Sequence, residues 1–477
     1  MRLRTKVAYN TIIQVASKAI ATMLGLVAIA VMTRYLGQTG FGQYTTIITF
    51  ISFFGIIVDF GLTLVTVQMI SQPGADEDKI INNLFSLRLV SAIILLGAAP
   101  LIVIFLPYEP VVKLGVAITS LAFLFIALNQ ILVGLFQKNL RMDKVSIAEV
   151  AGRIILVIGV IVAIKMDFGL LGIMIATVLA SAINFFLHFS FSRSFVRIRL
   201  RFDFYIWKDI IKRSWPLALT IAFNLIYLKA DTLILSLIKT QAEVGIYGAA
   251  YKVVDVLVTL PFMFAGIILP IMTFYWAENR STDFKNVLQK AFDFMAILAI
   301  PLIIGTQFVA RQVMIIVAGE DFAVSGSALR ILIISAGLIF LGCMFSHAII
   351  ALEKQKKIIG AYIFTSLTAL AGYLIFIPRF SYFGAAWVTI YSELVIAIAA
   401  GYYVYKYSKF LPNFKIVIKS LLASLVMASI IYFIPISYYQ AGFGMTLTLS
   451  FAVLIYFSSL YLFKGITKKD LTGLLNK

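Results

Sequence analysis

The sequence predicts an all-α polytopic membrane protein with fourteen transmembrane helices. Of its 477 residues, 62% are hydrophobic and 13% are charged, and the mean hydropathy is +1.01. Apolar segments long enough to cross about 30 Å of hydrocarbon, roughly 17–25 residues each, recur along the whole chain. Because the bilayer core has no water to satisfy free backbone groups, these segments are expected to be helices.

The expected helices follow one another with mostly short connections. They cover residues 10–35, 44–70, 80–106, 113–136, 147–165, 168–190, 215–237, 248–276, 289–309, 327–352, 358–377, 383–405, 416–434 and 443–463. The longest connection on the predicted cytoplasmic side, residues 191–214, interleaves basic with aromatic residues. That pattern is typical of an amphipathic segment lying on a membrane surface.

The basic residues predict the orientation of the chain. Most of the 40 Lys and Arg lie in the two tails and in the even-numbered connections. The odd-numbered connections carry only Arg34, Lys113, Lys165, Lys239, Arg311 and Arg379. Because basic connections stay on the cytoplasmic side, both termini are expected in the cytoplasm. The net charge of +19 then reflects topology and anionic lipid, and no nucleic-acid partner is expected.

Two short segments with a shared G-x-Y ending predict that the first twelve helices form two halves. The segment after the first helix ends in Gly42-Gln43-Tyr44, and the segment after the seventh ends in Gly245-Ile246-Tyr247. Six-helix halves that both start in the cytoplasm are parallel repeats, which hold a site at their interface. The predicted domains are an N-lobe (1–190), a cytoplasmic amphipathic linker (191–214), a C-lobe (215–409) and two further helices with a tail (410–477).

Three motifs near the N-terminus carry a family resemblance. Asn10, Gln14 and Ser17 recur along the first helix, an R-Y-L-G-x-x-x-F-G-x-Y turn spans Arg34 to Tyr44, and Asp59-Phe60-Gly61-Leu62 lies in the second helix. Together they resemble the Wzx-type polysaccharide flippases of the multidrug/oligosaccharidyl-lipid/polysaccharide (MOP) superfamily. Many relatives carry an Arg shortly after the D-F-G-L segment, whereas this chain has Gln68, so no anion-binding role is assigned there.

The resemblance implies both a fold and a function. The implied fold has two six-helix lobes in a V around a central cavity, with two extra helices that can form a groove for a lipid tail. The implied function is transport of an undecaprenyl-diphosphate-linked oligosaccharide from the inner to the outer leaflet by alternating access. The implied setting is the inner membrane, with a polysaccharide polymerase and assembly proteins as partners.

Lys18 and Arg88 are the leading candidates for holding the diphosphate. Charges inside a bilayer are costly and face protein or a water-filled cavity. Asn10, Gln14, Ser17, Lys18 and Thr22 recur every three or four residues and form one polar stripe, which cannot face lipid. Asn10 and Gln14 on this stripe are also expected to bind substrate. Arg88 is expected at a depth similar to that of Lys18. The alternative is that both cations only pair with acids.

Further intramembrane charges are candidates for the same cavity. Lys229 and Lys252 are expected to bind substrate, and Asp231 and Asp255 to line the cavity, unless the four pair with one another. Glu149 and Arg153, four residues apart on one helix, are instead expected to form a local ion pair.

Asp59 and Glu393 are the remaining candidate acids. Asp59 either touches substrate or neutralises Lys18 or Arg88. Glu393 has no sequence-adjacent cation and suits a proton-binding role, with a neutral structural glutamate as the alternative. The acids therefore suit coupling to a proton or Na⁺ gradient, and no cofactor, metal site or catalytic residue is expected.

Two other functions fit parts of the sequence. A membrane polysaccharide polymerase or ligase needs a sizeable outer loop, whereas the longest one expected here, about residues 310–326, is modest. A cation-coupled multidrug exporter of the same superfamily fits the helix pattern. The intramembrane cations and the last two helices favour an anionic lipid substrate over a cationic drug.

Overall fold

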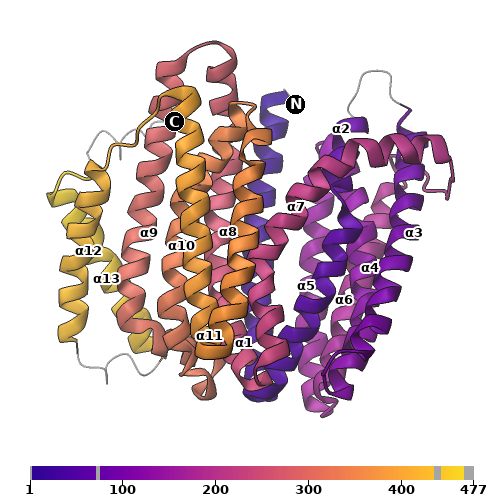
Figure 1. Ribbon diagram of the computed structural model, residues 1–477, viewed down its shortest axis with the longest axis horizontal. Coiled ribbons are helices and arrows are strands. Elements are labelled where there is room, and N and C mark those ends of the chain that lie inside the picture. The colour runs from indigo at the N-terminus through magenta and orange to yellow at the C-terminus, as the bar shows by residue number, and fades with distance from the viewer. Residues whose placement is uncertain (1–2, 71–75, 435–441, 467–477) are drawn as a thin grey trace. The chain divides into compact units, whose positions relative to one another are not determined.

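The protein is mostly helical in its computed structural model, which describes residues 3–70, 76–434 and 442–466 (Figure 1). The helices are α1 (Leu3–Asp59), α2 (Leu62–Ile70), α3 (Glu77–Ile104), α4 (Pro110–Lys138), α5 (Met142–Lys165), α6 (Gly169–Ser192), α7 (Phe204–Ile238), α8 (Gln241–Ala277), α9 (Ser281–Ala318), α10 (Ser325–Ala351), α11 (Gln355–Ser408), α12 (Lys415–Phe433) and α13 (Gly442–Leu462). A short 3₁₀ helix, Glu320–Phe322, precedes α10. The described residues include no strand.

Eleven of these helices, counted within the described residues, are long and apolar enough to cross a membrane. They correspond to the expected spans except 215–237, which lies within α7, and the last part of 44–70, which forms α2. This makes the protein a multi-pass membrane protein. The exact number of fourteen crossings and the cytoplasmic location of both termini stay predictions. The predicted tail beyond residue 466 and the side chain of Gln68 lie outside the described residues.

Two long helices each join two of the expected spans, although the second span of α1, 44–70, continues into α2. In α1 the axis bends at Gly37, whose backbone (φ 62°, ψ −172°) is not helical. In α11 the equivalent bend is at Ser381 (φ 51°, ψ −136°). A positive φ is easily adopted by glycine and is uncommon for serine. The connections expected at these two places are therefore tight bends that keep helical hydrogen bonding on both sides.

The helices form two units, residues 1–245 and 246–477. In the first unit, α1 packs on α3, α4 and α5, and α6 packs on α4 and α5. Its largest buried cluster is aliphatic and aromatic and is drawn from α1, α3, α4, α5 and α6. In the second unit, α10 lies between α9 and α11. The predicted lobe boundary at 191–214 differs from this division and stays a prediction about an internal repeat.

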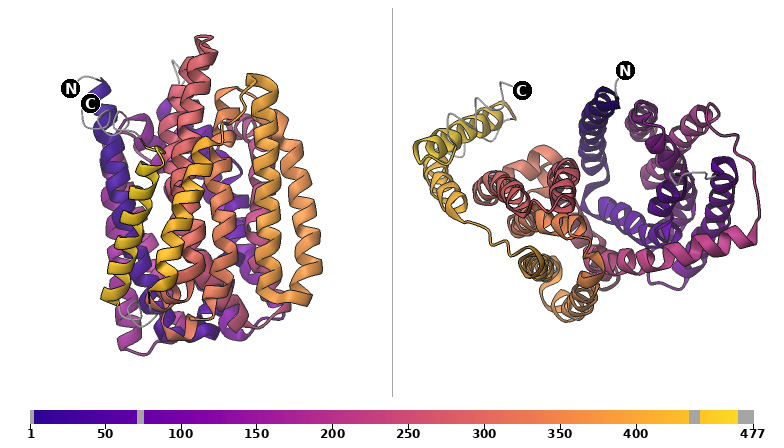
Figure 2. Two further views of the ribbon diagram at one scale, coloured as in Figure 1. Left: turned by 90° about the vertical axis from the view of Figure 1, so that its left-hand side faces the viewer. Right: turned by 90° about the horizontal axis from the view of Figure 1, so that it is seen from above.

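The last two helices are part of the second unit. Helix α12 lies against α9, and α13 packs beside α12 (Figure 2). A buried cluster joins the three helices through Val309, Met427, Met445 and Tyr456. The hydroxyl groups of Tyr456 and Ser420 are 2.6 Å apart, so one polar contact fixes α13 against α12.

The basic connection at 191–214 differs from the expected amphipathic helix. Residues 204–214 form the first turns of α7, and residues 196–203 are extended. The backbone N–H groups of Arg199, Arg201 and Asp203 donate to side-chain oxygens on α3, at 2.7–2.8 Å. Because these α3 side chains satisfy the backbone, the segment can stay extended without a strand partner.

Asp203 ends this extended segment and begins α7. Its carboxylate accepts from the backbone N–H groups of Tyr205 and Ile206 and lies 3.4 Å from Lys79. The hydrogen bond from the backbone of Ile206 is the main reason why the pKa of Asp203 is lowered. An ionised carboxylate at this N-terminus is the charge that a helix dipole favours.

Candidate functional site

A polar pocket lies within the first unit, between α1, α4, α5 and α6. Its volume is about 500 Å³. Its polar lining consists of Lys18, Asn129, Gln130, Glu149, Arg153, Thr177, Ser181, Asn184 and His188. So many polar groups among transmembrane helices are costly unless they pair with one another or meet a ligand, which makes this pocket the candidate site.

The polar stripe of the first helix faces α5. The side-chain oxygen of Asn10 accepts from the backbone N–H of Met142, at the start of α5, at 2.8 Å. Two turns further along α1 and one turn further along α5, the hydroxyls of Ser17 and Ser146 are 2.7 Å apart. The stripe therefore serves first to hold α1 against α5. Gln14, predicted to bind substrate, is exposed.

Lys18 follows on this stripe and lines the pocket. Its Nζ lies 3.2 Å from Oε1 of Glu149 on α5, and its side chain keeps 47% of its surface exposed. Glu149 is thus paired across helices with Lys18 and not, as its spacing predicted, with Arg153. A half-exposed pair of this kind contributes about 0–1 kcal/mol to stability, so Lys18 is free to contact a ligand at little cost.

Arg153 is left as an uncompensated cation in the pocket. It is exposed, and within the described part of the chain it has no ion-pair partner. One guanidinium nitrogen, Nη1, lies 3.8 Å from where a Cβ on Gly25 of α1 would stand. The guanidinium therefore lies close to α1, the helix that also carries Lys18.

The opposite side of the pocket, built by α4 and α6, is lined by neutral polar groups. Asn129 donates from Nδ2 to Oδ1 of Asn184 at 2.5 Å. The ring of His188 is bonded through Nδ1 to the backbone oxygen of Asn184 at 2.9 Å. Oδ1 of Asn129 and Nε2 of His188 are buried without a hydrogen-bond partner in the structure. Each such group costs about 1–3 kcal/mol.

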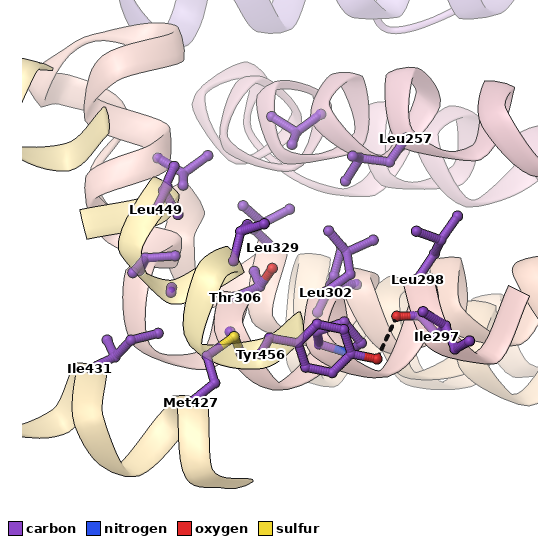
Figure 3. Close-up of a pocket in the computed structure, with 18 of the residues that line it drawn as sticks. Leu257, Ile297, Leu298, Leu302, Thr306, Leu329, Met427, Ile431, Leu449 and Tyr456 are labelled. Atoms are coloured by element: carbon purple, nitrogen blue, oxygen red, sulfur yellow. Dashed lines mark hydrogen bonds between the residues drawn. The ribbon is translucent and has the colours of Figure 1, made fainter. Parts of the chain in front are cut away.

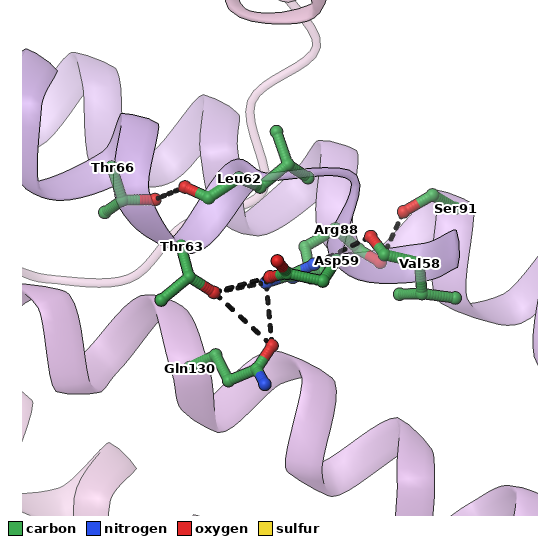
Figure 4. Close-up of polar contacts among 8 residues, drawn as sticks. All are labelled: Val58, Asp59, Leu62, Thr63, Thr66, Arg88, Ser91 and Gln130. Carbon is green, nitrogen blue, oxygen red and sulfur yellow. Dashed lines mark hydrogen bonds and ion pairs between the residues drawn. The ribbon is translucent and has the colours of Figure 1, made fainter. Parts of the chain in front are cut away.

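Arg88 is not among the residues that line the pocket, but it contacts Gln130 of this wall (Figure 4). Its side chain is completely buried. Nη1 donates to the backbone oxygen of Val58 at 2.7 Å, and Nη2 donates to Asp59 at 2.5 Å and to Gln130 at 2.9 Å. Thr63 accepts from Nη2 at 3.0 Å. A guanidinium is a donor-only group suited to gathering several acceptors in this way.

The D-F-G-L motif explains why these acceptors are available. Helix α1 ends at Asp59, and Phe60 (φ 45°) and Gly61 (φ 73°) turn the chain before α2 begins. The break leaves backbone oxygens without helical partners, and Arg88 satisfies that of Val58. Asp59 therefore neutralises Arg88, one of the two alternatives for this acid. No part of the side chain of Arg88 is exposed in this structure, and its role in binding substrate stays a prediction.

Three of the four charges predicted around the seventh and eighth helices have partners close by in the chain. Lys252 and Asp255 pair on α8 at 3.6 Å. Asp231, which is buried, accepts from the backbone N–H of Thr232 at 2.6 Å. Lys229 and Asp231 lie in the first unit, whereas Lys252 and Asp255 lie in the second. Their roles in binding substrate stay predictions.

Glu393 is buried in the second unit on α11, with 7% of its surface exposed. Its Oε1 has no hydrogen-bond partner in the structure. No described cation lies within ion-pair distance of its carboxyl group. An ionised carboxylate in such a place is poorly solvated.

An apolar pocket of about 390 Å³ lies within the second unit (Figure 3). It is lined by α8, α9, α10, α12 and α13, through side chains such as Leu257, Leu302, Leu329, Met427 and Leu449. Gly305 of α9 opens space in its wall, because a Cβ there would come within 3.3 Å of the flexible end of Met427. The pocket suits a hydrocarbon chain.

Sequence reasoning missed the α4–α6 wall of the polar pocket. No role was assigned from the sequence to Asn129, Gln130, Asn184 or His188. A signal was present, since Asn184 and His188 are four residues apart and Asn129-Gln130 is an amide pair within a predicted span. Amides are uncharged, so they did not stand out among intramembrane charges.

The comparisons with known proteins agree with one another. Residues 7–276 match the family model described as polysaccharide biosynthesis protein. No curated protein sequence matches the chain. A structure of the lipid II flippase MurJ in an inward closed conformation superposes with a TM-score of 0.78 at 18% identity, covering 97% of this chain and 100% of that one.

Multidrug transporters share the same fold. An inward-facing multidrug resistance MATE family transporter of the MOP superfamily superposes with a TM-score of 0.66 at 16% identity, covering 84% of this chain and 98% of that one. A MOP superfamily transporter from Pyrococcus furiosus superposes with a TM-score of 0.56 at 15% identity, covering 85% and 95%. At these identities the likeness concerns the fold alone.

Proposed function

Because this chain belongs to the polysaccharide biosynthesis protein family, we propose that it is a flippase for a lipid-linked oligosaccharide. Its substrate would be an oligosaccharide repeat unit on undecaprenyl diphosphate, moved from the inner to the outer leaflet by alternating access. The site of action would be the inner membrane, and a polysaccharide polymerase with its assembly proteins would use the product. The fold is one found in transporters, so the polymerase or ligase alternative is not retained.

The apolar pocket of the second unit is the observation that carries this proposal. A polyprenyl carrier needs a dry surface for its tail, and burial of each CH₂ group contributes about 0.8 kcal/mol. Helices α12 and α13 complete the pocket through Met427, Ile431 and Leu449. The superposition on the MurJ structure includes 97% of this chain, whereas that on the MATE family transporter includes 84%.

The diphosphate would be held in the polar pocket of the first unit by Lys18 and Arg153. Both lie on the α1–α5 side, and Arg153 is not neutralised by any described acid. Arg153 thus takes the place that the sequence had suggested for Arg88. Guanidinium and ammonium groups bind phosphate oxygens through charge-assisted hydrogen bonds.

Filling the apolar pocket tests the proposal. Gly305→Leu places a side chain in the pocket, where the end of Met427 can move aside, so the protein should still fold. Transport of the lipid-linked repeat unit into the outer leaflet of proteoliposomes should fall at least tenfold. The readout is the fraction of sugar that an added, membrane-impermeant glycosidase can reach.

Gly266→Leu is the matched control for this change. Gly266 lies exposed on α8 with nothing within 4 Å of its Cβ position, so the same side chain meets no neighbour. This variant should transport at the rate of the unchanged protein. Equal transport by both variants would show that the pocket does not hold the tail. No glycosidase-accessible sugar with the unchanged protein would contradict flippase function itself.

Proton coupling through Glu393 is the second part of the proposal. A buried carboxyl group without a cation is a suitable place to bind and release a proton during the cycle. Glu393→Gln keeps the shape and mimics the protonated form, so we expect transport to lose its response to a pH gradient while protein abundance stays normal. A response equal to that of the unchanged protein would exclude Glu393 as the coupling site.

A further inference from the structure

We propose that the α4–α6 wall of the polar pocket binds hydroxyl groups of the sugar next to the diphosphate. This wall is formed by Asn129, Gln130, Ser181, Asn184 and His188. The proposal rests on the proposed function and adds which part of the substrate this wall recognises. It divides the pocket into a cationic side, on α1 and α5, and a neutral side, on α4 and α6.

The orientation of Gln130 is set by Arg88. Nη2 of Arg88 donates to Oε1 of Gln130 at 2.9 Å, and a guanidinium can only donate. The oxygen of the amide must therefore face Arg88. Figure 4 shows the amide nitrogen on the side away from Arg88. Since Gln130 also lines the pocket, its N–H donors are the end left for a ligand.

The tautomer of His188 follows from its hydrogen bond. Nδ1 lies 2.9 Å from the backbone oxygen of Asn184, which can only accept, so Nδ1 carries the hydrogen. In the neutral ring Nε2 is then an acceptor. The residue is 1% exposed and Nε2 has no partner in the structure. Nε2 is therefore a buried hydrogen-bond acceptor that lacks a donor.

The pair of asparagines adds one group of each kind. Nδ2 of Asn129 is used by Asn184, which leaves Oδ1 of Asn129 buried and without a partner. Oδ1 of Asn184 accepts that hydrogen bond, so the amide N–H groups of Asn184 remain available to a ligand. Gly152 of α5 makes room for them, because a Cβ there would come within 3.2 Å of Nδ2 of Asn184.

The wall thus offers donors and acceptors together. A sugar hydroxyl both donates and accepts, so it can satisfy Nε2 of His188 and the amide N–H groups at once. Ionised diphosphate oxygens only accept, and they would leave Nε2 of His188 and Oδ1 of Asn129 without donors. The mixed polarity therefore fits a carbohydrate and does not fit the phosphate groups, for which Lys18 and Arg153 are suited.

Two lipids distinguish binding of the sugar by this wall from binding of the diphosphate. The probes are the lipid-linked repeat unit, extracted from cells that lack this protein, and undecaprenyl diphosphate without sugar. Binding of each to the purified full-length protein in nanodiscs is measured for His188→Leu. We expect the sugar-bearing lipid to bind about tenfold more weakly, the loss of one hydrogen bond, and the sugar-free lipid to bind within about twofold of the unchanged protein.

Thermal unfolding of the same variant distinguishes recognition from a structural role. Leucine removes an unsatisfied buried acceptor, so the unfolding midpoint should stay the same or rise while sugar binding falls. The matched control is His347→Leu on α10, where Nδ1 of the histidine has the same 2.9 Å contact with the backbone oxygen four residues earlier, outside this pocket. It should bind both lipids normally.

A smaller substitution keeps the test valid if His188→Leu fails to fold. Ser181→Ala removes one hydroxyl from the wall and should also weaken only the sugar-bearing lipid. Equal weakening of both lipids, or unchanged binding of the sugar-bearing lipid by either folded variant, would overturn the assignment of this wall to sugar. If the unchanged protein binds the sugar-bearing lipid no better than bulk phospholipid, the proposed function fails as well.

Discussion

Arg88→Met is expected to destabilise the folded protein by about 3–5 kcal/mol, the usual cost of removing one partner from a buried ion pair. The substitution leaves Asp59 without its cation and the backbone oxygen of Val58 without its donor. The measurements are the thermal unfolding midpoint in detergent and the amount of protein in the membrane fraction. Both should fall sharply.

Lys18→Met is the matched comparison for Arg88→Met. It removes a cation from an ion pair as well, but the side chain of Lys18 is 47% exposed, against 0% for Arg88. Abundance and midpoint should therefore stay close to those of the unchanged protein, and transport should fall because a phosphate ligand is lost. Arg88→Lys should recover little, because an ammonium group cannot reach the same set of acceptors. Normal abundance of Arg88→Met would contradict a structural role.

Gly42→Ala and Gly245→Ala should each prevent α1 from crossing the start of α8. A Cβ on Gly42 would stand 1.6 Å from the backbone oxygen of Gln241, and one on Gly245 would stand 2.0 Å from that of Gln38. Backbone atoms cannot rotate away, so the helices must separate. Overpacking costs about 1–3 kcal/mol in ordinary cores, and more is expected here. Thermal unfolding and membrane abundance report the effect.

Gly97→Ala is the control for these two changes. Gly97 is exposed on α3 and has nothing within 4 Å of its Cβ position, so alanine should be neutral or stabilise the helix by up to about 1 kcal/mol. If Gly42→Ala and Gly97→Ala have the same midpoint, the close approach of α1 and α8 is not required for the fold. Gly42 and Gly245 are the glycines of the two segments that share the G-x-Y ending, and these two segments contact each other.

The family and the helical membrane fold could be predicted from the sequence because both depend on local properties. Transfer of an apolar segment into hydrocarbon depends on the composition of that segment, and the expected spans correspond to helices, although 44–70 is divided between α1 and α2. The motifs at Arg34–Tyr44 and Asp59–Leu62 also correspond to local events, the bend at Gly37 and the break at Phe60-Gly61.

The site could be predicted only in part, because charge pairing depends on distances across the fold. Spacing on one helix paired Glu149 with Arg153, but Glu149 lies nearer to Lys18, which is 131 residues away in the chain. Because Glu149 pairs with Lys18, Arg153 is the cation left without an ion-pair partner among the described residues. Neutral groups such as Asn184 and His188 carry no charge signal, and their unmet hydrogen bonds exist only once α4 and α6 are packed.

The sequence by itself determined which segments are apolar enough to cross a membrane and which family the chain belongs to. The tertiary structure alone decided that Arg88 is buried as a structural ion pair while Lys18 and Arg153 line a pocket. The physical reason is that hydropathy is a property of each segment, whereas burial and hydrogen-bond satisfaction arise between segments far apart in the chain.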